Sequence, residues 1–383
     1  MSQKHIIIPI IILGIVLISL IFFLKTKPEI NQKKEVSLDE KIGEMLILGF
    51  RGTEVNESSK IIQDINQYHL GGVVLFDYDL PSKSFPRNIE NFEQTKKLID
   101  DIKNLTNPHL FIAVDAEGGN VNRLKPKYGF KEIESAQKMG EKEVLNTFEE
   151  ASKLGEELNL LGFNLNFAPV VDVNVNSDNP IIGYLERSFS EDPQKVFKHA
   201  DAFIDGMHKY NIITTIKHFP GHGSSKDDSH LGLTDITQTY NKEVELYPYK
   251  NLIEKDKVDI IMTAHIMNKN IDSENPATLS PLFLQDILRN ELKYKGVIIS
   301  DDMQMGAIVD NFGFEEAIIK SINAGCDLLG FSNNNNHEYD ENIAEKAVNV
   351  IKKAVQDGKI SEKRINESYN RIKTLKEKYN ILP

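Results

Sequence analysis

The chain has 383 residues but no tryptophan and a single cysteine. Enzymes that grip long polysaccharides often use tryptophan as a platform for sugar rings, so its absence favours a compact pocket for one small sugar. Cys326 lies in an apolar run, where it is expected to act as a small core residue. A lone cysteine cannot form an intrachain disulfide, so cysteine usage does not decide the compartment. No cysteine near the N-terminus could carry a lipid anchor.

The chain also has too little positive charge for a nucleic-acid-binding protein. Its 45 lysines and arginines face 57 acidic residues, which gives a formal net charge of −12 and a pI near 5.4. An acidic chain of this kind does not capture polyanions electrostatically. We therefore expect no nucleic-acid partner and a neutral or cationic substrate.

Residues 6–24 contain no charged side chain. As a helix they would span roughly 28 Å, about the hydrocarbon thickness of a bilayer. This predicts a transmembrane anchor at 6–24, after a short flank at 1–5 and before a polar tether at 25–36. The alternative is a cleaved signal peptide, although no small-x-small cleavage site follows Leu24.

The remaining residues, 37–383, are predicted to form one domain. Ser37 and Glu40 form a capping-box pattern that marks the start of its first helix. Apolar runs with the length of buried strands then recur at 45–50, 72–76, 110–115, 165–171, 212–217, 260–264, 297–300 and 327–331. Stretches with helical periodicity lie at 91–105, 146–161, 193–210, 283–292 and, as a docked terminal helix, 361–379. Eight buried strands alternating with helices favour a single (β/α)8 barrel of the α/β class, with a doubly wound sheet as the alternative.

Chemistry in such a barrel lies at the carboxyl ends of the strands. The seventh predicted strand ends in Asp301 and Asp302. Adjacent strand residues point to opposite sides, so at most one of the two should face the barrel axis. A carboxylate in a closed pocket can attack an anomeric carbon and stabilise an oxocarbenium-like transition state. The alternative is that both residues cap the following helix.

The fifth predicted strand ends in Lys217 and His218. A buried lysine needs an acidic partner, and Asp115, Glu117 and Asp172 are the candidates. With Arg123 and Arg187, these fixed charges suit multidentate recognition of sugar hydroxyls. They could equally form an internal network that stiffens the barrel mouth.

Asp228 and His230 follow in the same loop. A carboxylate two residues away can fix the orientation of an imidazole, which titrates near neutrality and suits acid–base catalysis. On spacing alone, an exposed polar loop with no catalytic function explains these residues equally well.

Taken together, these motifs resemble glycoside hydrolase family 3, in its β-N-acetylglucosaminidase branch. The resemblance runs from about Ser37 to the C-terminus. The matching segments are Lys217-His218-Phe219-Pro220-Gly221-His222-Gly223 with Asp228-Ser229-His230, Asp115-x-Glu117-Gly118-Gly119-x-Val121-x-Arg123, Phe167-Ala168-Pro169-Val170-Val171-Asp172-Val173-Asn174, Asn179-Pro180-Ile181-Ile182-Gly183 and Ser300-Asp301-Asp302-Met303. One departure is Ala116, where the family usually has glutamine.

The resemblance implies a retaining exo-β-N-acetylglucosaminidase that releases terminal β-linked N-acetylglucosamine from peptidoglycan-derived or other glycans. It implies that Asp301 is the nucleophile, that His230 is the acid/base and that Asp228 is its partner. The sugar-binding residues that it implies are Asp115, Arg123, Arg187, Lys217 and His218. No metal or cofactor is expected. With the predicted anchor, the catalytic domain is expected outside the cytoplasm, in a bacterial periplasm or at the cell surface.

Two other functions stay open. A zinc-dependent amidohydrolase could take ligands from His218, His222, His230, His265 and Asp228. That fold opens with a His-x-His at the end of its first strand, where this chain has Gly49-Phe50-Arg51-Gly52. A membrane-tethered sugar-binding protein without catalysis would have little need for both the nucleophile and the His–Asp pair.

Overall fold

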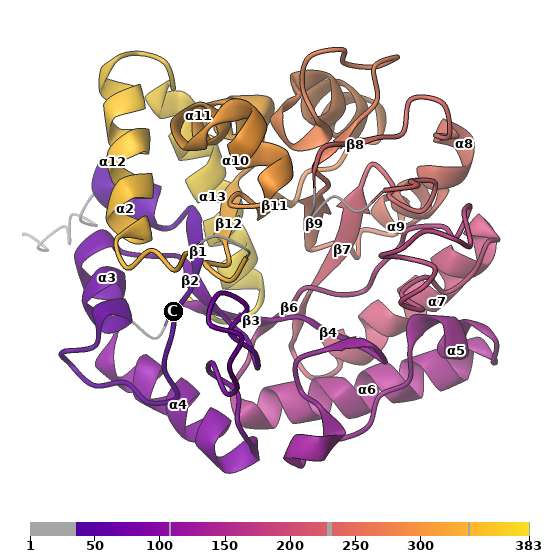
Figure 1. Ribbon diagram of the computed structural model, residues 1–383, viewed down its shortest axis with the longest axis horizontal. Helices are drawn as coiled ribbons and strands as arrows, with labels where there is room; N and C mark the ends of the chain where they lie inside the picture. Colours follow the sequence, from indigo (N-terminus) through magenta and orange to yellow (C-terminus); the bar gives the residue numbers. More distant parts are fainter. Residues whose placement is uncertain (1–35, 107–108, 228–231, 336–337, 383) are drawn as a thin grey trace, which may run out of the picture. The chain divides into compact units, whose positions relative to one another are not determined.

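The computed structural model describes residues 36–106, 109–227, 232–335 and 338–382. Residues Ser37–Pro383 form one compact unit whose centre is a closed barrel of eight parallel strands, surrounded by helices (Figure 1). In the order around the barrel the strands are β1 (Leu46–Gly49), β12 (Leu328–Phe331), β11 (Val297–Asp302), β9 (Ile260–Thr263), β7 (Ile213–Phe219), β6 (Leu165–Asn166), β3 (Phe111–Val114) and β2 (Gly72–Leu75).

Helices connect these strands and cover the outside of the barrel (Figure 1). The α-helices are α2 (Leu38–Gly43), α3 (Lys60–Tyr68), α4 (Phe92–Leu105), α5 (Ala136–Gly140), α6 (Val144–Leu161), α7 (Pro193–His208), α8 (Lys242–Glu245), α9 (Tyr247–Glu254), α10 (Gly306–Phe312), α11 (Phe314–Ala324), α12 (Ile343–Gln356) and α13 (Glu362–Lys378). Shorter elements are the 3₁₀ turns η2 (Pro126–Tyr128) and η3 (Ala277–Leu279) and the π-helix η4 (Leu282–Glu291). Two small sheets pair β4 (Ala116–Gly118) with β5 (Val121–Asn122), and β8 (Thr234–Asp235) with β10 (Ile266–Met267).

Each of the eight apolar runs contains one barrel strand. The strands are buried on both faces, because the helices cover the outside and apolar side chains fill the inside. The predicted capping box is confirmed: the Glu40 amide donates to the Ser37 hydroxyl, and the Ser37 amide donates to the Glu40 carboxylate at 2.7 Å.

The predicted fold class, a barrel preceded by a transmembrane helix, is corrected to the closed parallel barrel. Among the described residues, every helix is too short or too polar to cross a membrane. The longest, α6, has 18 residues and carries charged side chains such as Glu149, Lys153 and Glu156 on the face turned away from the barrel. The segment 6–24, where the anchor was predicted, lies outside the described residues.

Three strands end two or more residues away from the predicted end, and the other five end within one residue of it. β7 continues beyond Lys217 to Phe219, and β11 continues beyond Ser300 to Asp302. β6 ends at Asn166, before Pro169, which has no amide to donate to a ladder; pairing resumes where Val170 bridges to Lys217. The extensions carry polar residues of β7 and β11 into the mouth of the barrel.

The loop after β7 is packed too tightly for side chains at two of its positions. Gly221 has φ +126°, and a Cβ there would lie 2.3 Å from Oε2 of Glu245. A Cβ at Gly223 would lie 1.7 Å from the Val173 carbonyl oxygen. Asn179 fastens the other side of the loop by donating to the His222 carbonyl oxygen at 2.8 Å. The turn is therefore held from both sides.

Glu245 is a buried acid beneath this loop, and burial raises the pKa of its carboxyl to about 8. The groups that face it are acidic or neutral, namely Asp172, Tyr240, Tyr249 and Ser224, and neither of its carboxylate oxygens has a hydrogen-bond partner among the described residues. In the unfolded chain the pKa of a glutamate is near 4.3. A group with a raised pKa in the folded state contributes stability at low pH and loses it as the pH rises through the folded value.

We predict that the wild type loses folding stability as the pH rises and that Glu245→Gln does not show this loss. The free energy of unfolding of the wild type should fall, relative to that of Glu245→Gln, by a few kcal/mol between about pH 5 and pH 9. Urea denaturation at several pH values measures the difference. Glu243→Gln, at an exposed position in the same helix, is the control. A difference that does not change with pH would contradict the prediction.

A second buried acid joins the terminal helix to the amino end of β12. Asp327 is fully buried and accepts hydrogen bonds from Arg289 at 2.7 Å, from Arg364 and Arg371 at 2.9 Å each, and from Ser368 at 3.0 Å. Three of these four partners lie on α13, so the prediction of a docked helix at the C-terminus is confirmed.

Asp327→Asn should lower the free energy of unfolding by about 3–5 kcal/mol, since it removes a fully buried charge and leaves the largely covered Arg289 and Arg364 without their counter-charge. Urea denaturation measures this. Lys363→Ala, on the exposed face of the same helix, should change it by less than about 0.5 kcal/mol. A loss as small as that of the control would show that the arginine cluster does not hold α13 in place.

Candidate active site

A pocket of about 270 Å³ lies at the carboxyl ends of the barrel strands. Six of the eight predicted site residues line it: Asp115, Arg123, Arg187, Lys217, His218 and Asp301. The other two, Asp228 and His230, lie outside the described residues. A larger groove of about 870 Å³ lies at the amino ends of β9 and β11 and contains no predicted site residue. The fold thus brings the predicted residues together at the end of the barrel where chemistry is expected.

Lys217 lies at the centre of the site, with its side chain almost fully buried. Its Nζ lies 2.9 Å from Oδ1 of Asp115 and 2.6 Å from Oε1 of Glu117. The prediction that this lysine needs an acidic partner is confirmed, with two carboxylates in that role. Burial would lower the pKa of Lys217, but the charges of Asp115 and Glu117 outweigh burial and raise it. The pocket therefore contains a permanent cation.

Glu117 links this cation to a second one. Arg187 donates from Nε and Nη2 to the two oxygens of Glu117, at 2.8 Å each, and from Nη1 to the Ile181 carbonyl oxygen at 3.1 Å. Burial would raise the pKa of Glu117, but Arg187 and Lys217 outweigh it and hold that pKa below its usual range. Much of the hydrogen-bonding capacity of Arg187 is thus used inside the protein.

His218 is held between Asp172 and Arg187. Its Nδ1 lies 2.7 Å from Oδ2 of Asp172, and Nη2 of Arg187 lies 3.2 Å from its Nε2. Since arginine can only donate, this geometry places the proton of a neutral His218 on Nδ1. Burial would raise the pKa of Asp172, but His218 outweighs it and lowers that pKa. Nearby, burial lowers the pKa of His222 to about 4, so this second ring is neutral at pH 7.

Three polar groups in the pocket retain capacity for a ligand. Lys217 has three donors, of which two point at carboxylates. The guanidinium of Arg123 makes only long ion pairs, 3.9 Å to Asp115 and 4.0 Å to Asp77, and its buried Nε has no hydrogen-bond partner among the described residues. Oδ2 of Asp115 faces that arginine. Buried polar groups of this kind are normally satisfied, so they indicate the place of a polar ligand.

Asp301 and Asp302 both line the pocket, but their carboxylates have different surroundings. The pairing of β11 with β12 shifts register between Ile299 and Asp302, where the strand reaches the mouth of the barrel. Asp302 accepts hydrogen bonds from the Ser332 and Gln304 amides at 3.1 Å each, and burial raises its pKa. Asp302 therefore caps the following turn, as one alternative held, and Asp301 is the carboxylate presented to the pocket.

The histidines of the zinc alternative do not all converge. His265 binds Thr278 through Nδ1 at 2.9 Å and the Asp302 carbonyl oxygen through Nε2 at 2.9 Å. The rings of His218 and His222 lie 6.0 Å apart. No group of three potential ligands suited to a metal ion occurs among the described residues.

Sequence reasoning named Glu117 and Asp172 only as possible partners of Lys217, although both organise the site. A usable signal was present for Glu117: it lies two residues after Asp115, and residues two apart in an extended segment share a face. For Asp172 the sequence carried no such signal, because its contact with His218 depends on how β6 and β7 pair.

The comparisons with known proteins match most of the chain to one family. Residues 37–375 match the glycosyl hydrolase family 3 N-terminal domain. The chain is 36% identical over 297 residues to a beta-hexosaminidase of Tolumonas auensis, which covers 76% of this chain and 83% of that protein. It is 31% identical over 341 residues to beta-hexosaminidase A of Pseudoalteromonas piscicida, which covers 82% of this chain but only 54% of that protein.

Solved structures give the same result. The structure of a family 3 β-N-acetylglucosaminidase from Paenibacillus sp. superimposes with a TM-score of 0.81 at 31% sequence identity, over 90% of this chain and 63% of that one. The chain therefore belongs to glycoside hydrolase family 3 and lies among that family's β-N-acetylhexosaminidases.

Proposed function

We propose that this protein is a retaining exo-β-N-acetylglucosaminidase that hydrolyses terminal β-linked N-acetylglucosamine from peptidoglycan-derived or other glycans. The observation that carries the proposal is that Asp301 shares one small pocket with the Asp115–Lys217–Glu117 charges. A pocket of about 270 Å³ suits a single terminal sugar. The names of the relatives support the choice of an N-acetylhexosamine.

The open polar groups fit recognition of sugar hydroxyls. A hydroxyl can accept from Arg123 or Lys217 while it donates to Asp115, and such charge-assisted bonds are stronger than neutral ones. Lys217 and its two carboxylates are already positioned, so the protein needs little rearrangement when the sugar binds. Apolar side chains that include Phe76 and Met262 line other parts of the pocket.

The chemistry that we propose takes place in two steps. Asp301 attacks the anomeric carbon, the glycosidic C–O bond breaks, and protonated His230 gives its proton to the leaving oxygen. The glycosyl–aspartate is then hydrolysed by a water molecule, from which neutral His230 takes a proton as the oxygen bonds to the anomeric carbon. Asp228 would hold His230 in the orientation that both transfers need.

Replacing the nucleophile tests the proposal directly. Asp301→Asn should reduce kcat for an aryl β-N-acetylglucosaminide by roughly a thousandfold or more, because the amide cannot form the covalent intermediate. The melting temperature should stay close to that of the wild type. Asp310→Asn, exposed and nine residues further along, is the control and should keep full activity. Undiminished turnover by Asp301→Asn would exclude Asp301 as the nucleophile.

If His230 protonates the leaving group, the loss of kcat/KM in His230→Ala should depend on how strongly the leaving group needs a proton. His230→Ala should lower kcat/KM by roughly 10²–10⁴-fold for methyl β-N-acetylglucosaminide, whose leaving group needs a proton. The first step should be affected far less with a dinitrophenyl leaving group, which departs as an anion. Initial rates on both substrates measure the ratio, with Asp227→Asn as the control at an exposed neighbouring position. An equal loss on both substrates would contradict a role as acid.

A further inference from the structure

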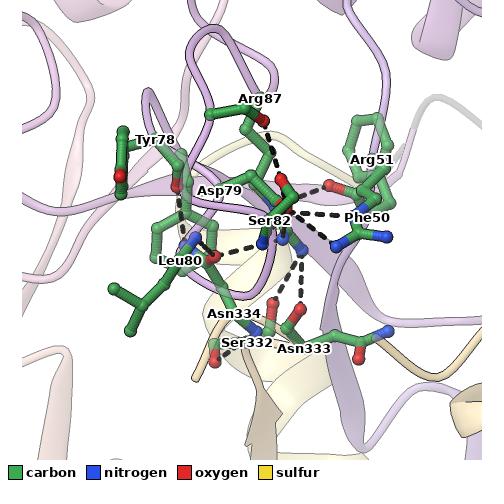
Figure 2. Close-up of polar contacts among 12 residues, drawn as sticks. Phe50, Arg51, Tyr78, Asp79, Leu80, Ser82, Arg87, Ser332, Asn333 and Asn334 are labelled. Atoms are coloured by element: carbon green, nitrogen blue, oxygen red, sulfur yellow. Dashed lines mark hydrogen bonds and ion pairs between the residues drawn. The ribbon is translucent and has the colours of Figure 1, made fainter. Parts of the chain in front are cut away.

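A second group of buried charges lies on the rim of the same barrel end, centred on Arg87. Figure 2 shows this group, which we call the Arg87 cluster: Arg51, Asp79, Arg87 and Asn334. The side chain of Arg87 is 0% exposed, so its positive charge is fully buried. None of the four residues lines the pocket, so the proposed reaction does not use them.

Arg87 joins the loops that follow three neighbouring strands. It donates from Nε to the Phe50 carbonyl oxygen at 3.0 Å, after β1, and from Nη2 to the carbonyl oxygens of Ser332 and Asn333 at 3.3 and 2.9 Å, after β12. Its own loop follows β2. Nη1 bonds to Asp79 and, at 3.1 Å, to Oδ1 of Asn334. One guanidinium thus connects the rims of β1, β2 and β12 (Figure 2).

Asp79 supplies the charge that makes this burial possible. Arg51 donates to both of its oxygens, at 3.0 and 2.8 Å, and Arg87 donates to Oδ1. Burial would raise the pKa of Asp79, but these arginines and Ser82 outweigh it and hold the pKa below its usual range. The ring of Tyr339 lies 4.3 Å from Arg51 and 5.5 Å from Arg87, where it stabilises the remaining positive charge.

The loop after β12, to which Arg87 donates, is also hydrogen-bonded to the end of β11. The Ser332 amide donates to Oδ1 of Asp302 at 3.1 Å, and the Ser332 hydroxyl donates to Oδ2. The Asp302 amide in turn donates to Oδ1 of Asp301 at 2.8 Å. An unbroken series of hydrogen bonds therefore leads from Arg87 through Ser332 and Asp302 to Asp301.

This series matters because the β-ladder does not set the direction of Asp301. The register of β11 against β12 shifts between Ile299 and Asp302, so Asp301 lies in the irregular stretch, and pairing resumes only where Asp302 faces Gly330. Contacts from the loop after β12 take the place of the ladder. The position of that loop depends in turn on the guanidinium that binds two of its carbonyl oxygens.

We propose that Arg87 is a positioning residue for Asp301, acting through the loop after β12 and Asp302. The proposal rests on the proposed function, in which Asp301 is the nucleophile. A misplacement of about 1 Å at a reacting group can cost roughly a hundredfold in rate, so the loss of this support should appear in kcat. We assign binding of the sugar to Asp115, Arg123 and Lys217. Among the described residues, no hydrogen bond or ion pair joins these three to the cluster, and Arg87 and Arg123 share only a contact with the ring of Phe76, so KM should change little.

The experiment compares Arg87→Ala with Arg289→Ala on an aryl β-N-acetylglucosaminide. Arg289 is a matched control: it is also a buried arginine that binds two carbonyl oxygens and one aspartate, but at the amino end of the barrel. Both variants should lose stability. We expect Arg87→Ala to lower kcat by roughly 10- to 100-fold with KM within about threefold of the wild type, and guanidinium ions to restore part of kcat. Arg289→Ala should keep its kcat.

A milder variant covers the case in which Arg87→Ala does not fold. Ser332→Ala removes the hydroxyl bond to Asp302 and the bond that this hydroxyl accepts from the Asn334 amide at 3.1 Å, and it should lower kcat by about 3- to 10-fold without a matching rise in KM. Unchanged kcat in folded Arg87→Ala or in Ser332→Ala, or an equal fall of kcat in Arg289→Ala, would overturn the proposal. If the wild type itself did not cleave the substrate, the proposed function would fail instead, so the two failures are distinguishable.

Discussion

The buried ammonium of Lys217 between Asp115 and Glu117 is the interaction on which the mouth of this barrel depends. A lone cation at that depth would be strongly unfavourable, and so would either carboxylate without it. Each of these buried charges is therefore stable only beside a neighbour of opposite charge. The resulting series of alternating charges and hydrogen-bond partners includes Lys125, Asp77, Arg123, Asp115, Lys217, Glu117, Arg187, His218 and Asp172.

The closed parallel barrel makes this series possible. Its strands all end on one side, so residues that follow β3, β6, β7 and β11 meet there although they are far apart in the chain. Lys217 and Asp115, for example, are 102 residues apart. Helices keep water from the outer face of the strands, and the interior is apolar below the mouth. The charges thus lie on a rigid, dry support, which is the arrangement that electrostatic catalysis requires.

Buried arginines at the two ends of the barrel do different work. At the amino end, Arg289 with Arg364 and Arg371 binds Asp327 and secures the terminal helix. At the carboxyl end, Arg87 binds the loops that surround the pocket. Both use the planar fork of a guanidinium to satisfy several oxygens at once. Only the second lies within a few hydrogen bonds of Asp301, the proposed nucleophile, which is why we assign a role in stability to the first and a role in active-site geometry to the second.

The sequence by itself determined the strands and most of the site. Uninterrupted apolar runs can be buried only between two layers, which identified the eight barrel strands, and the motifs identified Lys217, Asp301 and their neighbours. The sequence also predicted a membrane-spanning helix. None of the described helices could span a membrane, because each covers the barrel with one face and keeps a polar face on the other side. Tertiary structure alone decided that the carboxylate of Asp302 is bound by Ser332 and Gln304, because the first of these partners comes from the loop after β12. It also decided that Asp172 holds His218 and that Arg87 joins three loops. Such contacts depend on how distant segments pack, and local patterns in the chain carry no record of that packing.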